Sequence, residues 1–193
     1  MLTHSTYLWF IVGLVVIAVI YLISLYNQLV NVKNNVGKNW SNIDVLLKQR
    51  NDELPKLIDA CKVYMTFEKE TLEQMINARN AAVKAQAAVN LPDLNAAESI
   101  IHQGLGRLFA LAENYPDLKT NKSFIQLQSR ISDLENQIAD RRELYNESVK
   151  VNNVVIEQFP SNIIAGMFKF QHAQLLEFVA ERKDVNVANL FKS

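Results

Sequence analysis

Few residues in this chain could perform chemistry, and their spacing does not assemble a reactive site. The histidines are His4, His102 and His172. Glu98 and His102 follow the spacing Glu-x-x-x-His, whereas a di-iron site in a helical bundle needs two Glu-x-x-His pairs and further carboxylates. Because the sequence offers no second pair, we predict that His102 is a solvated or capping residue and that the chain has no metal site.

The other candidates for catalysis also have structural explanations. Cys61 lies on an apolar helical stripe without a neighbouring histidine, so it is predicted to be a small core residue rather than a nucleophile. Glu68, Glu70 and Glu73 form an acidic patch that a solvated helix face explains. The sequence contains no glycine-rich phosphate loop and no serine in a nucleophile elbow. We therefore predict that the protein is not an enzyme, has no catalytic residues and takes no cofactor.

Composition restricts the class of partner. Among 193 residues, Lys and Arg total 20 and Asp and Glu total 20, so the formal net charge is zero. A neutral body argues against nucleic-acid binding, which depends on neutralising phosphates. The presence of 1 cysteine excludes an intrachain disulfide framework, and the counts of 5 Gly and 4 Pro predict few turns and long elements.

The stretch Tyr7–Leu25 contains no charged residue over roughly 19 positions, which is the length that crosses a bilayer core as a helix. A cleaved signal peptide is the alternative, and it would show a basic leader, a shorter apolar core and a small-residue cleavage site. Residues 1–6 carry no Lys or Arg, and Tyr26-Asn27-Gln28 offers no such site. Tyr7–Leu25 is therefore predicted to be a permanent anchor whose partner is the lipid bilayer.

The charges that flank the anchor predict its orientation. The first charged residues after it are mostly basic: Lys33, Lys38, Asp44, Lys48 and Arg50. Cationic flanks are retained in the cytoplasm, and the lack of disulfide chemistry agrees with a reducing compartment. We expect residues 1–6 to lie outside, residues 7–26 to form a transmembrane helix, and the body that follows to be cytoplasmic.

Apolar residues then recur at steps of three and four, which predicts a single helix over about 27–87. The stripe contains Leu29, Val32, Val36, Trp40, Ile43, Leu47, Leu54, Leu57, Cys61 and Met65. Pro55 lies inside it, and a proline removes a backbone donor and clashes with the preceding turn. We expect a kink near residues 51–54, and a helix break there is the alternative.

Two further helices are predicted, over about 94–114 and about 122–158. Asp93 can cap the first of them, and either Asn121 or Ser123 can cap the second. Turns that contain proline precede both helices, at Asn90-Leu91-Pro92-Asp93 and at Tyr115-Pro116-Asp117-Leu118.

Polar and small residues interrupt the apolar patterns of these helices. The 122–158 helix is nearly a coiled-coil seam that ends at Phe159 and contains Arg141 and Asn152. Arg141 either lies in the seam and fixes its register or reaches water at its edge, and we favour the second. Gly104 and Gly106 indicate either the close approach of a neighbouring helix or a local weak spot.

Residues 161–193 are predicted to form a short helix, over about 163–170, followed by a tail too short to fold alone. The helix reads IIAGMFKF and is strongly apolar, so it either packs on the bundle or lies on the membrane surface. We favour packing, because Lys169 is its only basic residue whereas interfacial helices are rich in Lys and Arg.

The predicted fold class is all-α, with an N-terminal transmembrane helix followed by an antiparallel up-down helical bundle over 27–160. Short connections force consecutive helices to pack antiparallel. The 27–87 helix is far longer than its neighbours. A bend at Pro55 would let its halves serve as two helices of the bundle, or the extra length would form a stalk near the membrane.

Short motifs spread along the chain resemble the LemA family. The first block is Tyr26-Asn27-Gln28-Leu29-Val30, Trp40, Ile43-Asp44-Val45, Leu47-Lys48, Arg50, Asp52, Leu54-Pro55, Leu57, Lys62, Tyr64, Glu68 and Ala78-Arg79. The second is Tyr115-Pro116-Asp117-Leu118-Lys119, Asn121, Phe124, Leu127-Gln128, Glu135-Asn136, Ile138-Ala139, Arg142, Tyr145-Asn146 and Val149. The third is Phe159-Pro160-Ser161-Asn162-Ile163-Ile164-Ala165 with Phe170. Departures from the family pattern are Gln49 and Leu175-Leu176-Glu177-Phe178.

The resemblance implies a single-pass protein of the bacterial inner membrane, with its N-terminus outside and a cytoplasmic antiparallel helical bundle. The family has no established reaction, and one branch is associated with magnetosome membranes, which points to membrane organisation. The motif residues are interpreted as structural, with Tyr115-Pro116-Asp117 as a turn and Asp44 pairing with Lys48 one helical turn on.

We therefore predict a membrane-anchored scaffold or interaction protein that binds protein partners or assembles as a homo-oligomer. The alternative is an accessory or regulatory subunit of a membrane enzyme such as a protease. An enzyme in its own right is the third hypothesis, with Glu98 and His102 as its best candidates. A helical bundle fixes no function by itself, so the partners, the oligomeric state and the cellular process stay open.

Overall fold

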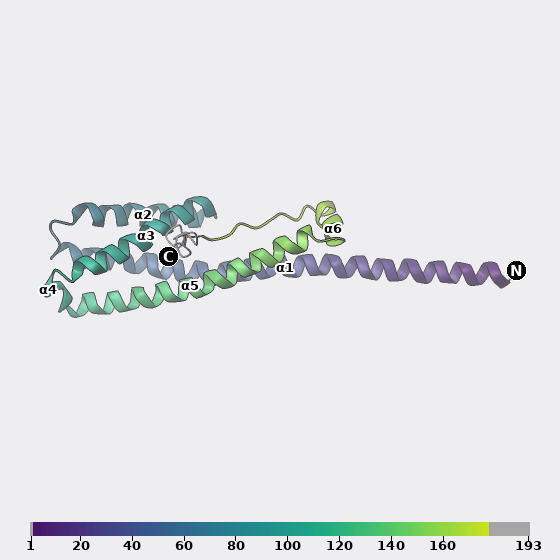
Figure 1. The fold of residues 1–193 in the computed structure, drawn as a ribbon, viewed down its shortest axis with the longest axis horizontal. Coiled ribbons are helices and arrows are strands. Elements are labelled where there is room, and N and C mark those ends of the chain that lie inside the picture. Colours follow the sequence, from purple (N-terminus) through teal and green to yellow (C-terminus); the bar gives the residue numbers. More distant parts are fainter. Residues whose placement is uncertain (1, 178–193) are drawn as a thin grey trace, which may run out of the picture. The chain divides into compact units, whose positions relative to one another are not determined.

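The computed structural model describes residues 2–177, with side chains from Tyr7 onward, and every regular element in this range is a helix. The elements are α1 (Leu2–Lys62), α2 (Lys69–Ala87), α3 (Leu91–Ala112), α4 (Pro116–Lys119), α5 (Lys122–Glu157) and α6 (Ser161–Met167) (Figure 1). The predicted all-α class, with a long apolar N-terminal helix followed by packed helices, is confirmed. The predicted tail beyond residue 177 lies outside the described residues.

The chain divides into two compact units that share α1 and α5. Unit 1 comprises residues 1–42 and 143–175, and unit 2 comprises residues 43–142 and 176–193. Unit 1 therefore contains the first part of α1, the end of α5 and α6, whereas unit 2 contains the rest of α1 and α5 together with α2, α3 and α4.

The first part of α1 in unit 1 carries apolar side chains that nothing in the unit covers. Between Tyr7 and Ile23 the large apolar side chains are from 43% to 81% exposed. The apolar window in this part of α1 has a mean hydropathy of 2.8, and only 6% of it is buried. By length and composition, this part of the helix can cross a membrane.

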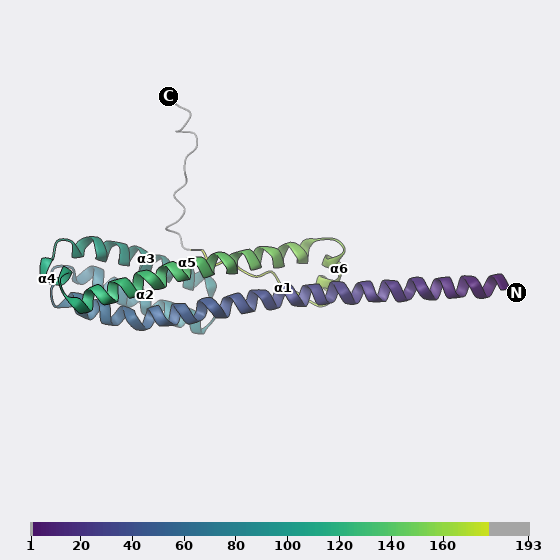
Figure 2. The same ribbon diagram turned by 90° about the horizontal axis from the view of Figure 1, so that it is seen from below.

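Beyond the apolar run, α1 packs on the end of α5 and on α6, which lies beside it (Figure 2). The core of this contact consists of Leu25, Leu29, Val155, Ile156, Ile164 and Ala165. Trp40 meets Tyr145 further along the two helices, with their ring centroids 5.8 Å apart. Residue numbers rise along α1 as they fall along α5, so the two helices are antiparallel in this unit.

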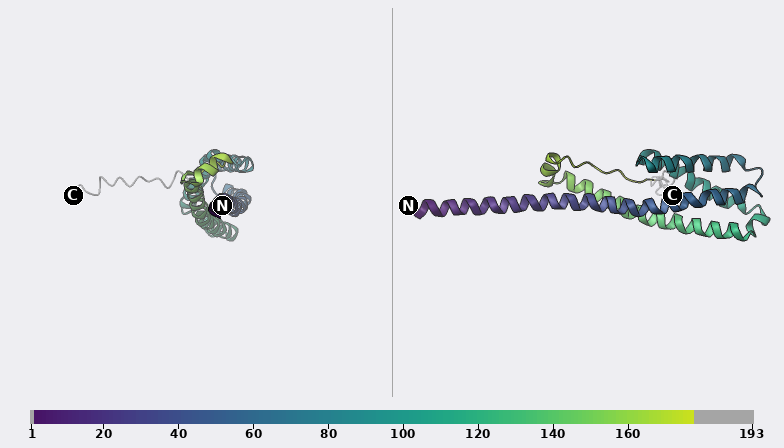
Figure 3. Two further views of the ribbon diagram at one scale, coloured as in Figure 1. Left: turned by 90° about the vertical axis from the view of Figure 1, so that its right-hand side faces the viewer. Right: turned by 180° about the vertical axis from the view of Figure 1, so that it is seen from behind.

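After α6 the chain returns along α5 (Figure 3). The amide of Asn153 donates to the backbone oxygen of Ala173 at 3.0 Å, and its Oδ1 accepts from the backbone nitrogen of Ala173 at 2.9 Å. The hydroxyl of Tyr145 donates to the backbone oxygen of Gln174 at 2.9 Å. Side chains of α5 therefore take up backbone groups of the returning segment, which has no regular structure of its own to satisfy them.

Unit 2 is an antiparallel arrangement of the second part of α1 with α2, α3 and the first part of α5. Gln86 bonds Asp44 while Arg79 bonds Asn51, so α2 runs against α1. Its apolar core includes Ile43, Leu47, Leu54, Leu57, Met75, Ala82, Leu94, Ile101, Leu105, Phe124, Ile131 and Ile138. These are the residues that the helical stripes of the sequence place on one face of each helix.

The prediction of one helix over 27–87 is wrong, because residues 63–68 separate α1 from α2. The backbone nitrogens of Tyr64 and Met65 both donate to the Cys61 oxygen, at 3.0 and 2.8 Å, and Met65 is only 1% exposed. The residue just before α5 fixes Tyr64, since the Asn121 amide donates to the Tyr64 hydroxyl at 3.1 Å. Tertiary contacts thus stabilise a turn that contains neither Gly nor Pro.

Pro55, by contrast, does not break α1, which continues to Lys62. A proline at this position leaves the carbonyl of Asn51, four residues earlier, without its helical donor. Arg79 of α2 supplies the missing donor, because its Nε donates to the Asn51 oxygen at 3.1 Å. The carbonyl that Pro55 leaves unpaired is therefore satisfied from the neighbouring helix, and the alternative of a helix break at this position is wrong.

Side-chain caps mark the starts of α3 and α5, and the sequence predicted one of the two correctly. Asn121 caps α5, since its Oδ1 accepts from the Phe124 nitrogen at 3.1 Å. The expectation that Asp93 caps the preceding helix is wrong, because Asn90 is the N-cap and accepts from the Asp93 nitrogen at 3.3 Å. The predicted ranges 94–114 and 122–158 correspond to Leu91–Ala112 and Lys122–Glu157.

The structure decides between the alternatives given for the glycine and polar residues that interrupt the apolar patterns of α3 and α5. A Cβ on Gly104 would lie 2.8 Å from the Cγ of Met75 on α2, whereas one on Gly106 would meet nothing within 4 Å. Gly104 therefore marks a close helix approach and Gly106 does not. Arg141 is exposed and Asn152 is buried, while Phe159, placed in the seam by the sequence, is 81% exposed.

Removing the Arg79 donor tests how Pro55 is tolerated. We expect Arg79→Met to lower the free energy of unfolding by about 1–3 kcal/mol, because the Asn51 carbonyl loses its hydrogen bond. In a Pro55→Ala background the loss should fall below about 1 kcal/mol, since the N–H restored at position 55 can donate instead. Chemical denaturation in detergent, followed by circular dichroism, measures both.

Arg107→Met serves as the control for loss of an exposed arginine on a neighbouring helix. Equal losses from Arg79→Met with and without Pro55 would show that Arg79 does not compensate for the proline.

Candidate functional site

A fully buried arginine and two carboxylates form the most concentrated group of charges in the described part of unit 2. Both Arg50 and Glu98 have 0% of their side chains exposed. The Nη1 and Nη2 of Arg50 donate to the two carboxylate oxygens of Glu98, each at 2.6 Å, which makes the pair bidentate. Nη1 also donates to Oε1 of Glu135 at 3.0 Å. The cluster therefore joins α1 to α3 and α5.

The electrostatics of the cluster keep the guanidinium charged. Burial by itself would lower the pKa of Arg50, but the charges of Glu98 and Glu135 and their hydrogen bonds raise it above its ordinary value. Taking these ions out of water is costly, and their mutual attraction offsets that cost only when hydrogen bonds are well formed. The Nε of Arg50 has no hydrogen-bond partner among the described residues. The bonds from Nη1 and Nη2 to the carboxylates must therefore offset the cost of removing the guanidinium from water.

The structure does not bring Glu98 and His102 together as a pair. Glu98 is held by Arg50, whereas Nδ1 of His102 lies 3.2 Å from Oε2 of Glu135. The His102 side chain is 49% exposed, so the ring lies at the surface end of the cluster. Within residues 2–177 no group of three or more His, Cys, Asp and Glu side chains is placed to hold a metal ion. The cluster is thus one buried cation that two carboxylates share, with His102 beside the second carboxylate.

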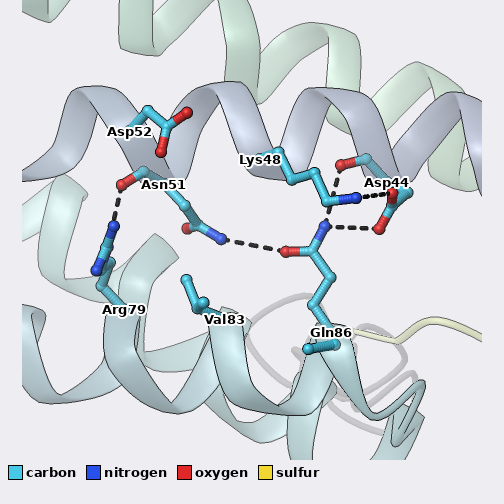
Figure 4. Close-up of a pocket in the computed structure, with 8 residues that line it drawn as sticks. Asp44, Lys48, Asn51, Asp52, Arg79, Val83 and Gln86 are labelled. Atoms are coloured by element: carbon cyan, nitrogen blue, oxygen red, sulfur yellow. Dashed lines mark hydrogen bonds and ion pairs between the residues drawn. The ribbon is translucent and has the colours of Figure 1, made fainter.

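A polar groove of about 420 Å³ lies between α1 and α2 (Figure 4). It is lined by Asp44, Lys48, Asn51, Asp52, Arg79, Val83, Gln86 and Ala87. Nζ of Lys48 donates to Oδ2 of Asp44 at 2.6 Å, which confirms the predicted pairing one helical turn apart. Gln86 Nε2 donates to Oδ1 of Asp44 at 2.8 Å, so the Asp44 carboxylate receives donors from both helices.

Asn51 connects the groove to the buried cluster. Its Nδ2 donates to Oε1 of Gln86 at 3.4 Å in the groove, and its Oδ1 accepts from Nη2 of Arg50 at 3.3 Å in the core. Polar contacts therefore continue across unit 2 from Lys48 in the groove to His102 at the surface. Such a network can fix the register of packed helices, and its open end in the groove can exchange hydrogen bonds with a bound partner.

The remaining candidate residues lie apart from this network. Cys61 is fully buried, and burial raises the pKa of its thiol to about 12, which agrees with a core residue. Glu70 and Glu73 are exposed on α2 and Glu68 is half-buried before it. His172 Nδ1 lies 3.7 Å from Oε1 of Glu157 in unit 1. The side chain of His4 lies outside the described side chains.

The buried cluster was missed from the sequence, although a signal was present. Arg50 stands between Leu47 and Leu54 at the three- and four-residue steps of the α1 stripe. Glu98 occupies the corresponding position between Leu94 and Ile101 on α3. A basic residue and an acidic residue that each replace an apolar stripe position indicate a buried pair, because either one alone would be too costly to bury.

The chain is similar in sequence to one protein family and to several known bacterial proteins. A family model described as the LemA family matches residues 39–189. The chain is 29% identical over 169 residues to Protein LemA of Metamycoplasma hominis, a match that covers 85% of this chain and 74% of that protein. It is 23% identical over 177 residues to Magnetosome protein MamQ 1 and Magnetosome protein MamQ 2 of Paramagnetospirillum magneticum, covering 79% of this chain. The chain spans 64% of the length of these MamQ proteins.

Substituting the buried arginine tests whether the ion cluster holds the helices together. We expect Arg50→Met to lower the free energy of unfolding by about 3–5 kcal/mol, because it leaves the Glu98 carboxylate buried without a counter-ion. Arg130→Met is the matched control: Arg130 pairs with Glu53 at 3.0 Å but is 62% exposed, so its loss should cost at most about 1 kcal/mol. Urea denaturation of both variants in detergent measures the difference. Similar losses from the two variants would contradict a structural role for the buried cluster.

Proposed function

This chain belongs to the LemA family, and from that premise we propose that it is a single-pass membrane scaffold or interaction protein. The span over 7–26 holds the helical body at the cytoplasmic face of the bacterial inner membrane, with residues 1–6 on the opposite side. The body assembles with further copies of the chain, and its role is to organise the membrane rather than to catalyse a reaction.

The exposure of the apolar part of α1 carries this proposal. The large apolar side chains between Tyr7 and Ile23 are at least 43% exposed, so the protein itself does not bury them. A contiguous surface of this kind in water promotes aggregation, whereas lipid tails solvate it. A helix also satisfies its own backbone hydrogen bonds, which the bilayer core requires. The bilayer is therefore the solvent that suits this segment.

The flanking charges support the proposed orientation. Lys33 and Lys38 are exposed on α1 soon after the apolar run, whereas residues 1–6 contain neither Lys nor Arg. Basic residues close to the end of a span favour the cytoplasmic side. The amide side chains of Asn27, Gln28 and Asn31 lie between the run and the first lysine, as expected where a helix leaves the hydrocarbon core.

The pairing of the charged groups supports a scaffold rather than an enzyme. Glu98 and Glu135 accept hydrogen bonds from Arg50, and Asp44 accepts from Lys48 and Gln86. These carboxylates are therefore engaged by donors of the protein itself, as in a network that holds helices together. These groups stiffen the body, and the groove beside Lys48 presents a polar surface to a partner.

The similar MamQ proteins support a role in organising a membrane. The names of the MamQ proteins assign them to the magnetosome. This chain spans only 64% of the length of those proteins, so a role of the longer proteins reaches this chain only as a proposal. Membrane organisation by an anchored helical body is the role that we transfer.

Labelling of introduced cysteines tests the orientation. Phe67→Cys places a thiol at a position that is 92% exposed in the loop between α1 and α2, and Ser5→Cys places one before the span. A thiol reagent that cannot cross membranes should label Ser5→Cys in intact cells and Phe67→Cys only after lysis. The native protein is the control, because Cys61 is buried and should stay unlabelled. Labelling of Phe67→Cys in intact cells would reverse the topology.

Mass measurement in a membrane mimic tests the assembly. The chain has a mass of 22.0 kDa, and native mass spectrometry from detergent or nanodiscs should give species of two or more copies of that mass. Recovery of single copies bound to one stoichiometric partner would contradict self-assembly and would support an accessory subunit of a membrane enzyme, such as a protease. Recovery of single copies without a partner would also contradict it.

A further inference from the structure

We propose that an apolar patch at α6, formed by Phe159, Ile163, Met167 and Phe168, inserts into the lipid headgroup layer beside the end of the span. The inference rests on the proposed membrane span, and it adds a second contact between the protein and the bilayer. All of the residues concerned belong to unit 1.

The two faces of α6 have different environments. Ile164 and Ala165 are 6% and 2% exposed and pack on Leu25 and Leu29 of α1. Ile163 and Met167, one helical turn apart on the opposite face, are 57% and 68% exposed. Packing on the protein and contact with the membrane are therefore compatible, because a single short helix performs each with a different face.

The flanking residues extend the exposed face. Phe159, just before α6, is 81% exposed, and Phe168, just after it, is 54% exposed. Phe168 does not move freely, since its ring lies 4.8 Å from the ring of Tyr26 on α1. The backbone nitrogen of Phe170 donates to the Ala165 oxygen at 2.9 Å, which closes the end of α6 and directs Phe170 toward α1. The patch is thus held in place by the protein.

Helix geometry places this patch at the membrane boundary. A helix rises about 1.5 Å per residue, so a helix that enters a hydrocarbon core of about 30 Å at Tyr7 leaves it roughly 20 residues later, near Tyr26. The packing partners of α6, which are Leu25 and Leu29, lie within one turn of that point. The headgroup layer extends about 5 Å or more beyond the hydrocarbon core. Because α6 packs on α1 at this level, α6 lies within the headgroup layer.

The chemistry around the patch fits this layer. Tyr26, Phe168 and Phe170 form an aromatic group, with Tyr26 and Phe170 centroids 6.1 Å apart, and aromatic rings are enriched at membrane interfaces. Nζ of Lys33 lies 5.8 Å from the centre of the Phe170 ring, and Lys169 is exposed next to it. Cations beside an apolar patch suit a surface of anionic headgroups above acyl chains.

Lipid is favoured over a protein partner because the patch is continuous with the apolar surface of α1. Ile20 and Ile23 are 62% and 55% exposed just before Leu25, and Tyr26, at 38%, lies between the two residues of α1 that pack on α6. α6 has only seven residues, too few to bind a membrane strongly alone, so its attachment to the span supplies the proximity. A second copy of the chain or another protein would have to displace lipid from this position.

Spin labels on the full chain in nanodiscs of phosphatidylethanolamine and phosphatidylglycerol test the proposal. Labels are placed through Ile163→Cys and Met167→Cys on the patch, and through Val15→Cys within the span. Leu144→Cys is the matched control: Leu144 is an exposed apolar residue of unit 1, at 50%, and its oxygen accepts from Nδ2 of Asn39 far from Tyr26. Cys61 is buried and does not compete for the label.

The measured quantity is the ratio of collision rates with oxygen, which concentrates in lipid, and with a nickel chelate, which stays in water. We expect both patch labels to show a ratio several-fold above that of Leu144→Cys and below that of Val15→Cys. A patch ratio equal to that of Leu144→Cys, with Val15→Cys in lipid, would overturn the insertion and leave the span intact.

Two other results are also decisive. If Val15→Cys itself has the ratio found in water, the span and the insertion both fail. A low collision rate of the patch labels with both oxygen and the nickel chelate would show that protein covers the patch. If the spectra are also broadened by the same label on a neighbouring copy, a second copy covers the patch and lipid does not.

Discussion

The structure depends on one constraint: an apolar helical surface that the protein does not cover and that water does not tolerate. Between Tyr7 and Ile23, α1 presents large apolar side chains that remain outside any core. Backbone hydrogen bonds are complete within the helix, so transfer of this segment to lipid leaves no polar group unsatisfied. The contacts of unit 1 begin where the apolar run ends, at Leu25 and Leu29. Membrane attachment and the start of the packed body are thus set by the same helix.

Unit 2 uses charge to organise a helical body in which apolar packing is otherwise non-directional. Arg50 binds Glu98 and Glu135 from inside the core, and Asn51 extends the polar contacts to Gln86 in the groove. Removing one member of such a set is costly, whereas an apolar residue can often be exchanged for another of similar volume at a smaller cost. The hydrogen bonds from Arg50 to Glu98 and Glu135 thus tie α1 to α3 and α5 within unit 2.

The sequence predicted the helical class, the apolar run and most core positions, because three- and four-residue periodicity reports directly on one buried face. It did not reveal the turn at 63–68, since that segment contains no Gly or Pro and Glu68 makes no side-chain cap for α2. It correctly favoured a continuous helix over a break at Pro55, but it could not show that Arg79 of a different helix supplies the lost hydrogen bond. The buried cluster left a signal, because Arg50 and Glu98 each occupy an apolar stripe position, but the sequence does not say that they are partners. The donor for the Asn51 carbonyl and the pairing of Arg50 are both contacts between residues distant in the sequence, which local propensity does not contain.

Extraction of native bacterial membranes tests the central claim most directly. Membranes washed with alkaline carbonate release proteins that are attached only at the surface, and intact mass then reports whether the N-terminal residues remain. The account predicts that the chain stays in the membrane pellet, is released by detergent, and retains the residues of the apolar run. Release by carbonate, or a mature chain without Tyr7–Leu25, would contradict it.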